Sequence, residues 1–119
     1  MFFVRGEPCA ATNNLVRDRI NEIIRASGKR CSVETLSEPK YRQALQAKLV
    51  EEAQEACGAA PDELLTELAN LQEVIVSMLA AWHISPEKVQ QIQDQRRAER
   101  GGFEQRLKLL WTKDGDEDV

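Results

Sequence analysis

The segment from Pro61 to Trp82 constrains the fold of this chain most. Its large apolar side chains recur every three or four residues, which is the period of one face of an α-helix. They are Leu64, Leu68, Leu71, Val74, Ile75, Met78, Leu79 and Trp82. This apolar surface is wider than a helix covered on one side needs, so we expect the helix to be buried on more than one side. A second subunit is the expected cover for the excess.

Two further segments, 13–27 and 37–58, show the same helical period, and a fourth helix over residues 85–100 is expected from its start and stop signals. Their start and stop signals are Asn13, Ser37 and Pro86 at the beginnings, and Gly28, Gly58 and the Gly101-Gly102 pair at the ends. Residues 31–36 alternate polar and apolar side chains but lack a partner segment, so we expect an extended connection there. Aromatic residues are only 5% of the chain within 42% apolar residues, a composition that suits helices. The predicted fold is all-α, with four helices.

One helical domain is expected over residues 13–112, after an N-terminal extension over residues 1–12. Phe103 and residues 107–111 are expected to pack back as a short arm. Residues 113–119 are expected to form an acidic, disordered tail. Four tail acids account for the whole net charge of −4, so the rest of the chain sums to about zero. That balance disfavours binding to a nucleic-acid polymer and fits a single nucleotide better.

The cysteines and the first residues bear on localisation. Cys9, Cys31 and Cys57 are odd in number and form no CxxC motif, so we expect reduced thiols rather than disulfides or a zinc site. The opening Met1 to Val4 is apolar but too short for a signal peptide or a membrane span. A soluble, cytoplasmic protein without a membrane partner is the expectation.

Carboxylates gather at helical spacing on two neighbouring predicted helices. Glu51, Glu52 and Glu55 lie within one turn of one another, and Glu67 and Asn70 repeat the three-residue spacing. A short loop joins the two helices, so these oxygens are expected to converge. Oxygen ligands of this kind suit Mg²⁺ or Mn²⁺, and no His or Cys is near in sequence to favour zinc. The alternative for such a cluster is a solvated helix face.

The order Glu-Glu-x-x-Glu, an eleven-residue gap and then Glu-x-x-Asn resembles a family signature. It is similar to that of the MazG and phosphoribosyl-ATP pyrophosphohydrolase superfamily, whose members are all-α nucleotide pyrophosphohydrolases. Two more blocks resemble the short MazG-like branch: Asn-Leu-Val-Arg-Asp-Arg-Ile over residues 14–20 and Arg-Ala-Glu-Arg-Gly-Gly-Phe over residues 97–103. The resemblance spans residues 14–110, with the blocks in the family's order.

The resemblance implies a MazG-like four-helix bundle that forms a homodimer or a dimer of dimers. It also implies Mg²⁺-dependent hydrolysis of a nucleoside triphosphate to the monophosphate and pyrophosphate. Carried over by position, Glu52, Glu55, Glu67 and Asn70 would hold the metal. Glu51 would complete the site or, like Glu52, take part in catalysis by accepting a proton from water.

Basic and aromatic residues near these blocks are candidates for contact with the nucleotide. The candidates for phosphate binding are Arg17, Lys48, Arg97 and Arg100. The alternative role of each is a surface ion pair with one of the abundant acids. Trp82 and Phe103 are candidates for stacking on a base, with core packing or a dimer contact as the alternative.

Asn70 departs from the family pattern, which has Asp at this position. A neutral amide oxygen still coordinates Mg²⁺, but the lost charge weakens a site that acts by concentrating charge. Three outcomes stay open: a tolerated ligand change, a weakened enzyme, or a silent homologue that binds a nucleotide or a partner. Glu73, one turn further on, is a candidate for compensating charge. Phosphoribosyl-ATP hydrolysis is a further alternative with the same chemistry.

Overall fold

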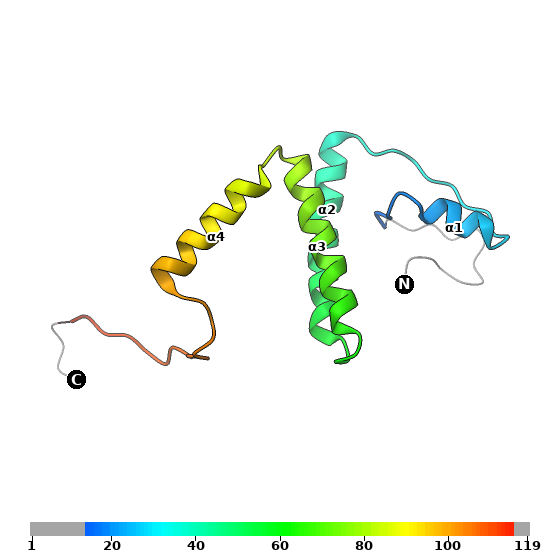
Figure 1. Ribbon diagram of the computed structural model, residues 1–119. Coiled ribbons are helices and arrows are strands. Elements are labelled where there is room, and N and C mark those ends of the chain that lie inside the picture. Colours follow the sequence, from blue (N-terminus) through cyan, green and yellow to red (C-terminus); the bar gives the residue numbers. More distant parts are fainter. Residues whose placement is uncertain (1–13, 116–119) are drawn as a thin grey trace. The chain divides into compact units, whose positions relative to one another are not determined.

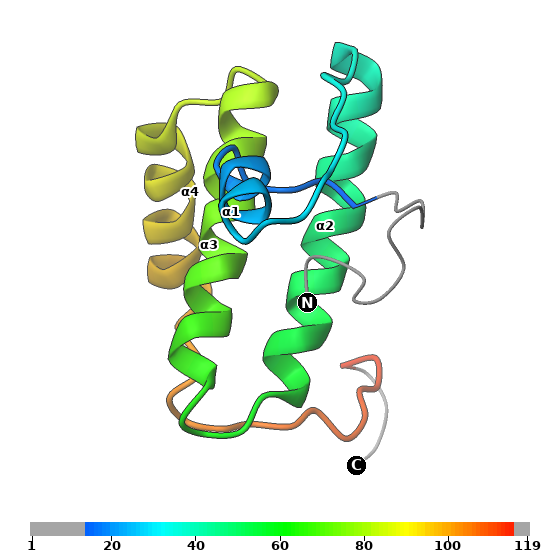
Figure 2. The same ribbon diagram turned by 90° about the vertical axis from the view of Figure 1, so that its right-hand side faces the viewer.

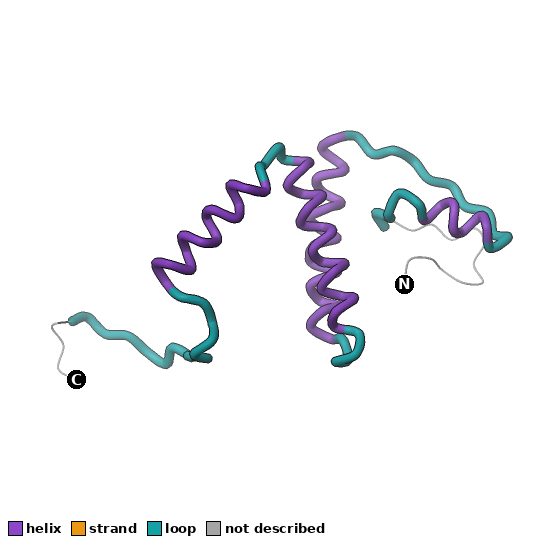
Figure 3. Tube along the Cα trace, viewed as in Figure 1, coloured by secondary structure: helices purple, strands orange, loops and turns teal. Residues whose placement is uncertain are grey.

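The computed structural model describes residues 14–115, which contain four α-helices and no strand. The helices are α1 (Ile20–Ala26), α2 (Glu38–Gly58), α3 (Leu64–Ala81) and α4 (Pro86–Arg100) (Figures 1 and 3). The all-α prediction is therefore confirmed. The chain divides into two units, residues 1–85 and 86–119, and each is described by itself. The four-helix bundle and the dimer stay predictions.

The α2 and α3 helices form an antiparallel pair joined by residues 59–63, and they lie side by side in both views (Figures 1 and 2). Leu45 of α2 and Val74 of α3 are the buried apolar residues within the described chain. The predicted bounds of α2 are confirmed, with extended backbone at Ser37 and a proline in the first turn. This helix pair carries the residues that follow as the candidate site.

The start of α3 lies three residues after the predicted Pro61. The backbone N–H groups of Glu63 and Leu64 donate to the carbonyl of Ala60 at 2.9 and 3.1 Å, which closes a tight turn over residues 61–63. Proline fixes the backbone of this turn and brings no N–H group that would need a partner. The proline and the acids after it therefore mark the turn that leads into α3.

Arg42 connects the beginning of α2 to the end of α3. Its Nε and Nη2 atoms donate to the carbonyl of Ala81 at 3.1 and 2.7 Å. The guanidinium carbon lies 5.2 Å from the centre of the Trp82 ring, and Nη2 pairs with Glu38 at 2.9 Å. Carbonyls in the last turn of a helix lack partners within the helix, so Arg42 caps α3 from the neighbouring helix.

The first helix is shorter than the predicted segment 13–27, because α1 begins only at Ile20. Asn13, its expected N-cap, lies outside the described residues, and no side-chain cap is present at Arg19, where the helix starts. The stop is as predicted: Gly28 follows the helix with φ of +89°, a value that glycine adopts without strain. Residues 31–36 form the expected connection without regular structure.

The second unit contains α4 and the residues after it. The helix has the predicted bounds, and Gly101 ends it with φ of +82°. The large apolar side chains beyond the helix are 63–96% exposed: Phe103, Leu107, Leu109, Leu110 and Trp111. Packing of these residues as a short arm against the rest of the chain therefore stays a prediction. Most of the acidic tail, the N-terminal extension and Cys9 lie outside the described residues, while Cys31 and Cys57 are free thiols.

Much of the apolar surface of α3 faces away from α2. Leu65, Leu68 and Val76 are 80%, 45% and 58% exposed, although all three belong to the most apolar helix of the described chain. By length and composition alone, α3 is also long and apolar enough to cross a membrane, a test that core helices of soluble proteins pass as well. Within the first unit, α3 therefore has more apolar surface than α2 covers.

Candidate metal centre

Three carboxylates meet between α2 and α3. Glu52 and Glu55 lie one turn apart on α2, and Glu67 reaches them from α3. One carboxylate oxygen of each residue lies within 4.8 Å of the others. The three-residue spacing on α2 and the antiparallel pairing of the helices produce this convergence, as the sequence predicts. Carboxylate oxygens are ligands that suit Mg²⁺ and Mn²⁺, so these three residues could hold part of the coordination of such a cation.

The cluster contains carboxylate oxygens that no hydrogen-bond donor reaches. Glu52 is only 8% exposed, and its Oε2 atom is buried without a partner. Oε2 of Glu67 is likewise buried and has no hydrogen-bond partner among the described residues. A buried acceptor left without a partner is unfavourable, and more so when it carries charge. The two oxygens therefore offer unused acceptor positions to a cation between the helices.

The surroundings of Glu67 also disfavour its negative charge. Burial raises the pKa of its carboxyl group above the ordinary value of 4.5, because removal from water disfavours the charged form. A hydrogen bond with the Glu55 carboxyl group raises it further, as does repulsion from Glu55, Glu52 and Glu63. A bound divalent cation would reverse this effect by favouring the ionised form.

Glu51 and Lys48 lie beside the cluster rather than in it. The Lys48 ammonium is 3.2 Å from Oε1 of Glu51 and 3.7 Å from Oε1 of Glu52. Lys48 thus forms an ion pair with Oε1 of Glu52, while Oε2 of the same carboxylate has no hydrogen-bond partner among the described residues. The ion-pair alternative expected for Lys48 is present in the structure. Glu51, half-exposed, remains a candidate for accepting a proton at the edge of the cluster.

Asn70 faces an arginine from the segment before α1. Nη2 of Arg17 donates to Oδ1 of Asn70 at 2.8 Å. Asn70 is one helical turn from Glu67, so the guanidinium is held next to the cluster. Sequence reasoning named both residues but not their contact, which joins positions far apart in the chain. The amide oxygen expected to bind metal is engaged with Arg17 here, and its role as a ligand stays a prediction.

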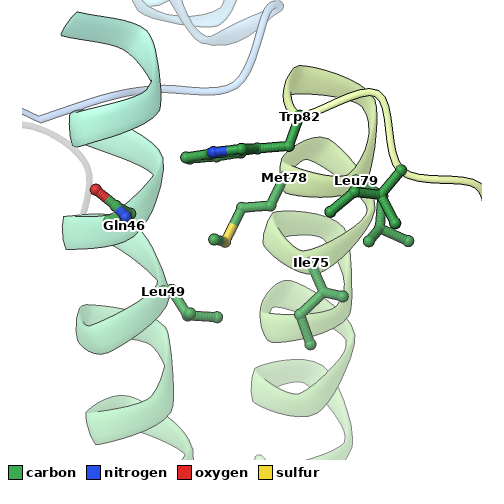
Figure 4. A pocket seen from close by; sticks show the side chains of 7 residues that line it. Gln46, Leu49, Ile75, Met78, Leu79 and Trp82 are labelled. Carbon is green, nitrogen blue, oxygen red and sulfur yellow. The ribbon is translucent and has the colours of Figure 1, made fainter. Parts of the chain in front are cut away.

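A pocket of about 460 Å³ opens between α2 and α3, and it begins one turn from Glu52 at Leu49. Its lining is Gln46, Leu49, Ile75, Met78, Leu79, Trp82 and Ile84. In Figure 4 the Trp82 ring reaches from α3 toward α2, with Met78 and Leu49 below it. Sequence reasoning named Trp82 but missed the pocket. The sequence signal that could have indicated the pocket was the helical spacing of apolar residues on the sides of α2 and α3 that face each other.

The remaining predicted residues belong to the second unit, so their position relative to the carboxylates is not described. Arg97 forms an ion pair with Glu104, with Nη2 and Oε1 at 3.0 Å. Arg100 lies in the last turn of α4, and Phe103 is 96% exposed. Their roles in phosphate binding and base stacking stay predictions.

Comparison with known proteins gives one short similarity. A curated, uncharacterized protein of Mycolicibacterium smegmatis (strain ATCC 700084 / mc(2)155) is 58% identical over 41 residues. The match covers 34% of this chain and 42% of that protein, so the chain spans under half the length of its relative. No family model matches the chain, and no solved structure matches it. Arguments about function therefore rest on the residues themselves.

Proposed function

We propose that this chain is a Mg²⁺-dependent nucleoside triphosphate pyrophosphohydrolase, as its resemblance to MazG-like proteins implies. The observation that supports the proposal best is the pair of buried oxygens without partners, Oε2 of Glu52 and Oε2 of Glu67. They belong to a cluster whose third member, Glu55, places an oxygen within 4.8 Å. A solvated acidic face would not bury such oxygens without donors.

The donor set fits Mg²⁺ or Mn²⁺, because it consists of carboxylate oxygens. When bound, such a cation would stabilise charge on the α-phosphate and on the leaving pyrophosphate and would acidify the attacking water. The water oxygen forms a bond to the α-phosphorus, and the bond from that phosphorus to the bridging oxygen breaks. Glu51 or Glu52 accepts the proton of the water. The products are a nucleoside monophosphate and pyrophosphate.

The proposed substrate extends along the α2–α3 pair. Its phosphates bind at the carboxylate centre, and its base and sugar occupy the apolar pocket that begins at Leu49. A volume of about 460 Å³ falls within the usual range for small-molecule pockets. Trp82 supplies the aromatic surface for stacking. The pocket offers few hydrogen-bonding groups, since only Gln46 and the indole N–H of Trp82 are polar among its lining side chains.

Pyrophosphate release from a panel of nucleotides with Mg²⁺ and with Mn²⁺ tests the proposal. The panel includes non-standard nucleotides and phosphoribosyl-ATP, since the latter activity is the alternative enzyme. Glu67→Gln should reduce turnover at least about a hundredfold, because it removes a ligand charge from the site. Glu34→Gln is the control, because Glu34 is an exposed carboxylate outside the cluster. A lack of turnover for every nucleotide would rule the enzyme out.

A second candidate function is a catalytically silent, nucleotide- or partner-binding homologue. Asn70 favours it, because an amide stands where the family pattern has a metal-binding carboxylate and its oxygen faces Arg17. Under this alternative the protein binds Mn²⁺ and nucleotides without releasing pyrophosphate. Calorimetric titration beside the turnover panel separates the two candidates.

We also propose that the working form is a homodimer or a dimer of dimers. The proposal rests on α3, whose Leu65 and Val76 side chains are 80% and 58% exposed. A helix that is apolar on most of its surface is stable in water when further partners cover it. A second copy of the same pair would complete a four-helix arrangement by symmetry.

A further inference from the structure

The contact between Arg17 and Asn70 places a cation beside the carboxylate centre. Nη2 of Arg17 lies 2.8 Å from Oδ1 of Asn70, and Asn70 is one turn along α3 from Glu67. Arg17 is exposed, and Asn70 is half-buried. The guanidinium is therefore held against α3 at Asn70, one turn from Glu67, by a side chain that is otherwise exposed.

The chemistry of the two partners decides what Arg17 can do there. A guanidinium has five N–H donors in a planar fork that matches phosphate oxygens. The amide of Asn70 uses a donor of Nη2 but carries no charge, so the positive charge of Arg17 is not neutralised. Lys48 differs, because it pairs with Glu51 and Glu52. Arg17 is thus the better candidate of the two for binding an anion.

We infer that Asn70 is a positioning residue, which holds Arg17 as the phosphate-binding side chain of the centre. The inference rests on the proposed function and names the part of the substrate involved, the polyphosphate of a nucleotide. It also gives the amide at position 70 a role of its own. A carboxylate at this position would add one negative charge to the metal site, but it would pair with Arg17 and compete with the phosphate.

The deciding variant is Asn70→Asp. The experiment measures binding of a nucleoside triphosphate analogue with a methylene bridge between the α and β phosphorus atoms, by calorimetry with Mg²⁺. We expect the Kd of the analogue to rise about tenfold, which is the size of one charge-assisted phosphate contact. The melting temperature should stay the same or rise, because the tether becomes an ion pair. In turnover, KM should rise more than kcat falls.

Arg17→Gln provides the matched test of charge. Glutamine removes the charge, and its amide is two bonds closer to the backbone than Nη2, so phosphate binding and the contact with Asn70 are both weakened. We expect a similar rise in Kd with little change in the melting temperature, because one exposed contact contributes little to stability, and partial rescue of Kd by Arg17→Lys. Arg25→Gln is the control, since Arg25 is exposed on α1 and donates only to the carbonyl of Cys31.

The outcomes separate this inference from the proposed function. If Arg17→Gln binds the analogue as well as the parent does, Arg17 does not bind phosphate, and the inference is overturned. Tighter Mn²⁺ binding with raised turnover in Asn70→Asp would overturn it too, because position 70 would then be a metal ligand. If the parent binds the analogue but releases no pyrophosphate from any triphosphate of the turnover panel, and both variants weaken analogue binding, the inference holds while the enzyme activity fails. A parent that binds no analogue overturns both.

Discussion

At the residue scale, Glu67 is the carboxylate whose ionisation the fold opposes. It faces Glu55 and Glu52 across the α2–α3 pair, and its Oε2 atom has no donor. When no cation is bound, the folded protein therefore holds the proton of Glu67 to a higher pH than the unfolded chain does. This preference couples the stability of the chain to pH and to divalent metal.

The pKa of Glu67 is raised above its ordinary value of 4.5, so the folded state keeps the proton where the unfolded state has lost it. The stabilisation from this proton is complete below pH 4.5 and is lost as pH rises through the raised pKa. In EDTA, we expect the melting temperature to fall as pH rises through this window, and to fall less in Glu67→Gln. Added Mn²⁺ should recover the loss at pH 8 in the parent only. Equal pH profiles for parent and variant would contradict this assignment.

Single residues also show how far the sequence could predict the site. Glu52, Glu55 and Glu67 follow from helical spacing and a short loop, so their convergence was predictable. The hydrogen bond from Arg17 to Asn70 was not, because it depends on where an irregular segment meets α3. No periodic pattern encodes that meeting point.

At the element scale, the helices with local stop signals were predicted most closely. The bounds of α2 and α4 follow from Ser37, Pro86 and Gly101, whose preferences act within one turn. The first helix is shorter than its periodicity indicates, because an amphipathic pattern alone does not offset the cost of nucleating a helix. Tertiary contacts decide such marginal turns.

Arg42 gives the helix pair a testable connection. We expect Arg42→Ala to lower the free energy of unfolding by about 1–2 kcal/mol, through loss of the bonds to the Ala81 carbonyl and the contact with Trp82. Urea unfolding measures the change. Arg25→Ala is the control, because its hydrogen bond to Cys31 is long, at 3.5 Å. Equal effects of the two variants would show that Arg42 does not hold the pair together.

At the scale of the whole molecule, the described chain has few buried apolar side chains for the apolar surface that it carries. Leu45 and Val74 are buried within the described residues, while Leu65 and Val76 of α3 are largely exposed. Sequence periodicity predicts an apolar face, but it does not identify the surface that covers it. Whether two copies of the chain associate through α3 therefore has to be measured.

Light scattering after size exclusion should find the parent as a dimer or tetramer at micromolar concentration. Val76→Lys should shift it toward monomer, because a charge would enter the proposed interface. Gln43→Lys is the matched control, since it adds the same charge at an exposed polar position of α2, outside the proposed interface. A monomeric parent, or equal behaviour of both variants, would exclude α3 as the interface.

The placement of Trp82 has an optical consequence. The chain contains two tryptophans, and Trp111→Phe leaves Trp82 as the single indole emitter, at the wall of the pocket beside Leu79. A base that stacks on this ring should quench its fluorescence. We expect its emission to fall when a nucleotide analogue and Mg²⁺ are added, and to stay constant with pyrophosphate and Mg²⁺. An equal response to both ligands would show that the base does not stack on Trp82. The fluorescence of this indole therefore distinguishes binding of the base from binding of the phosphates.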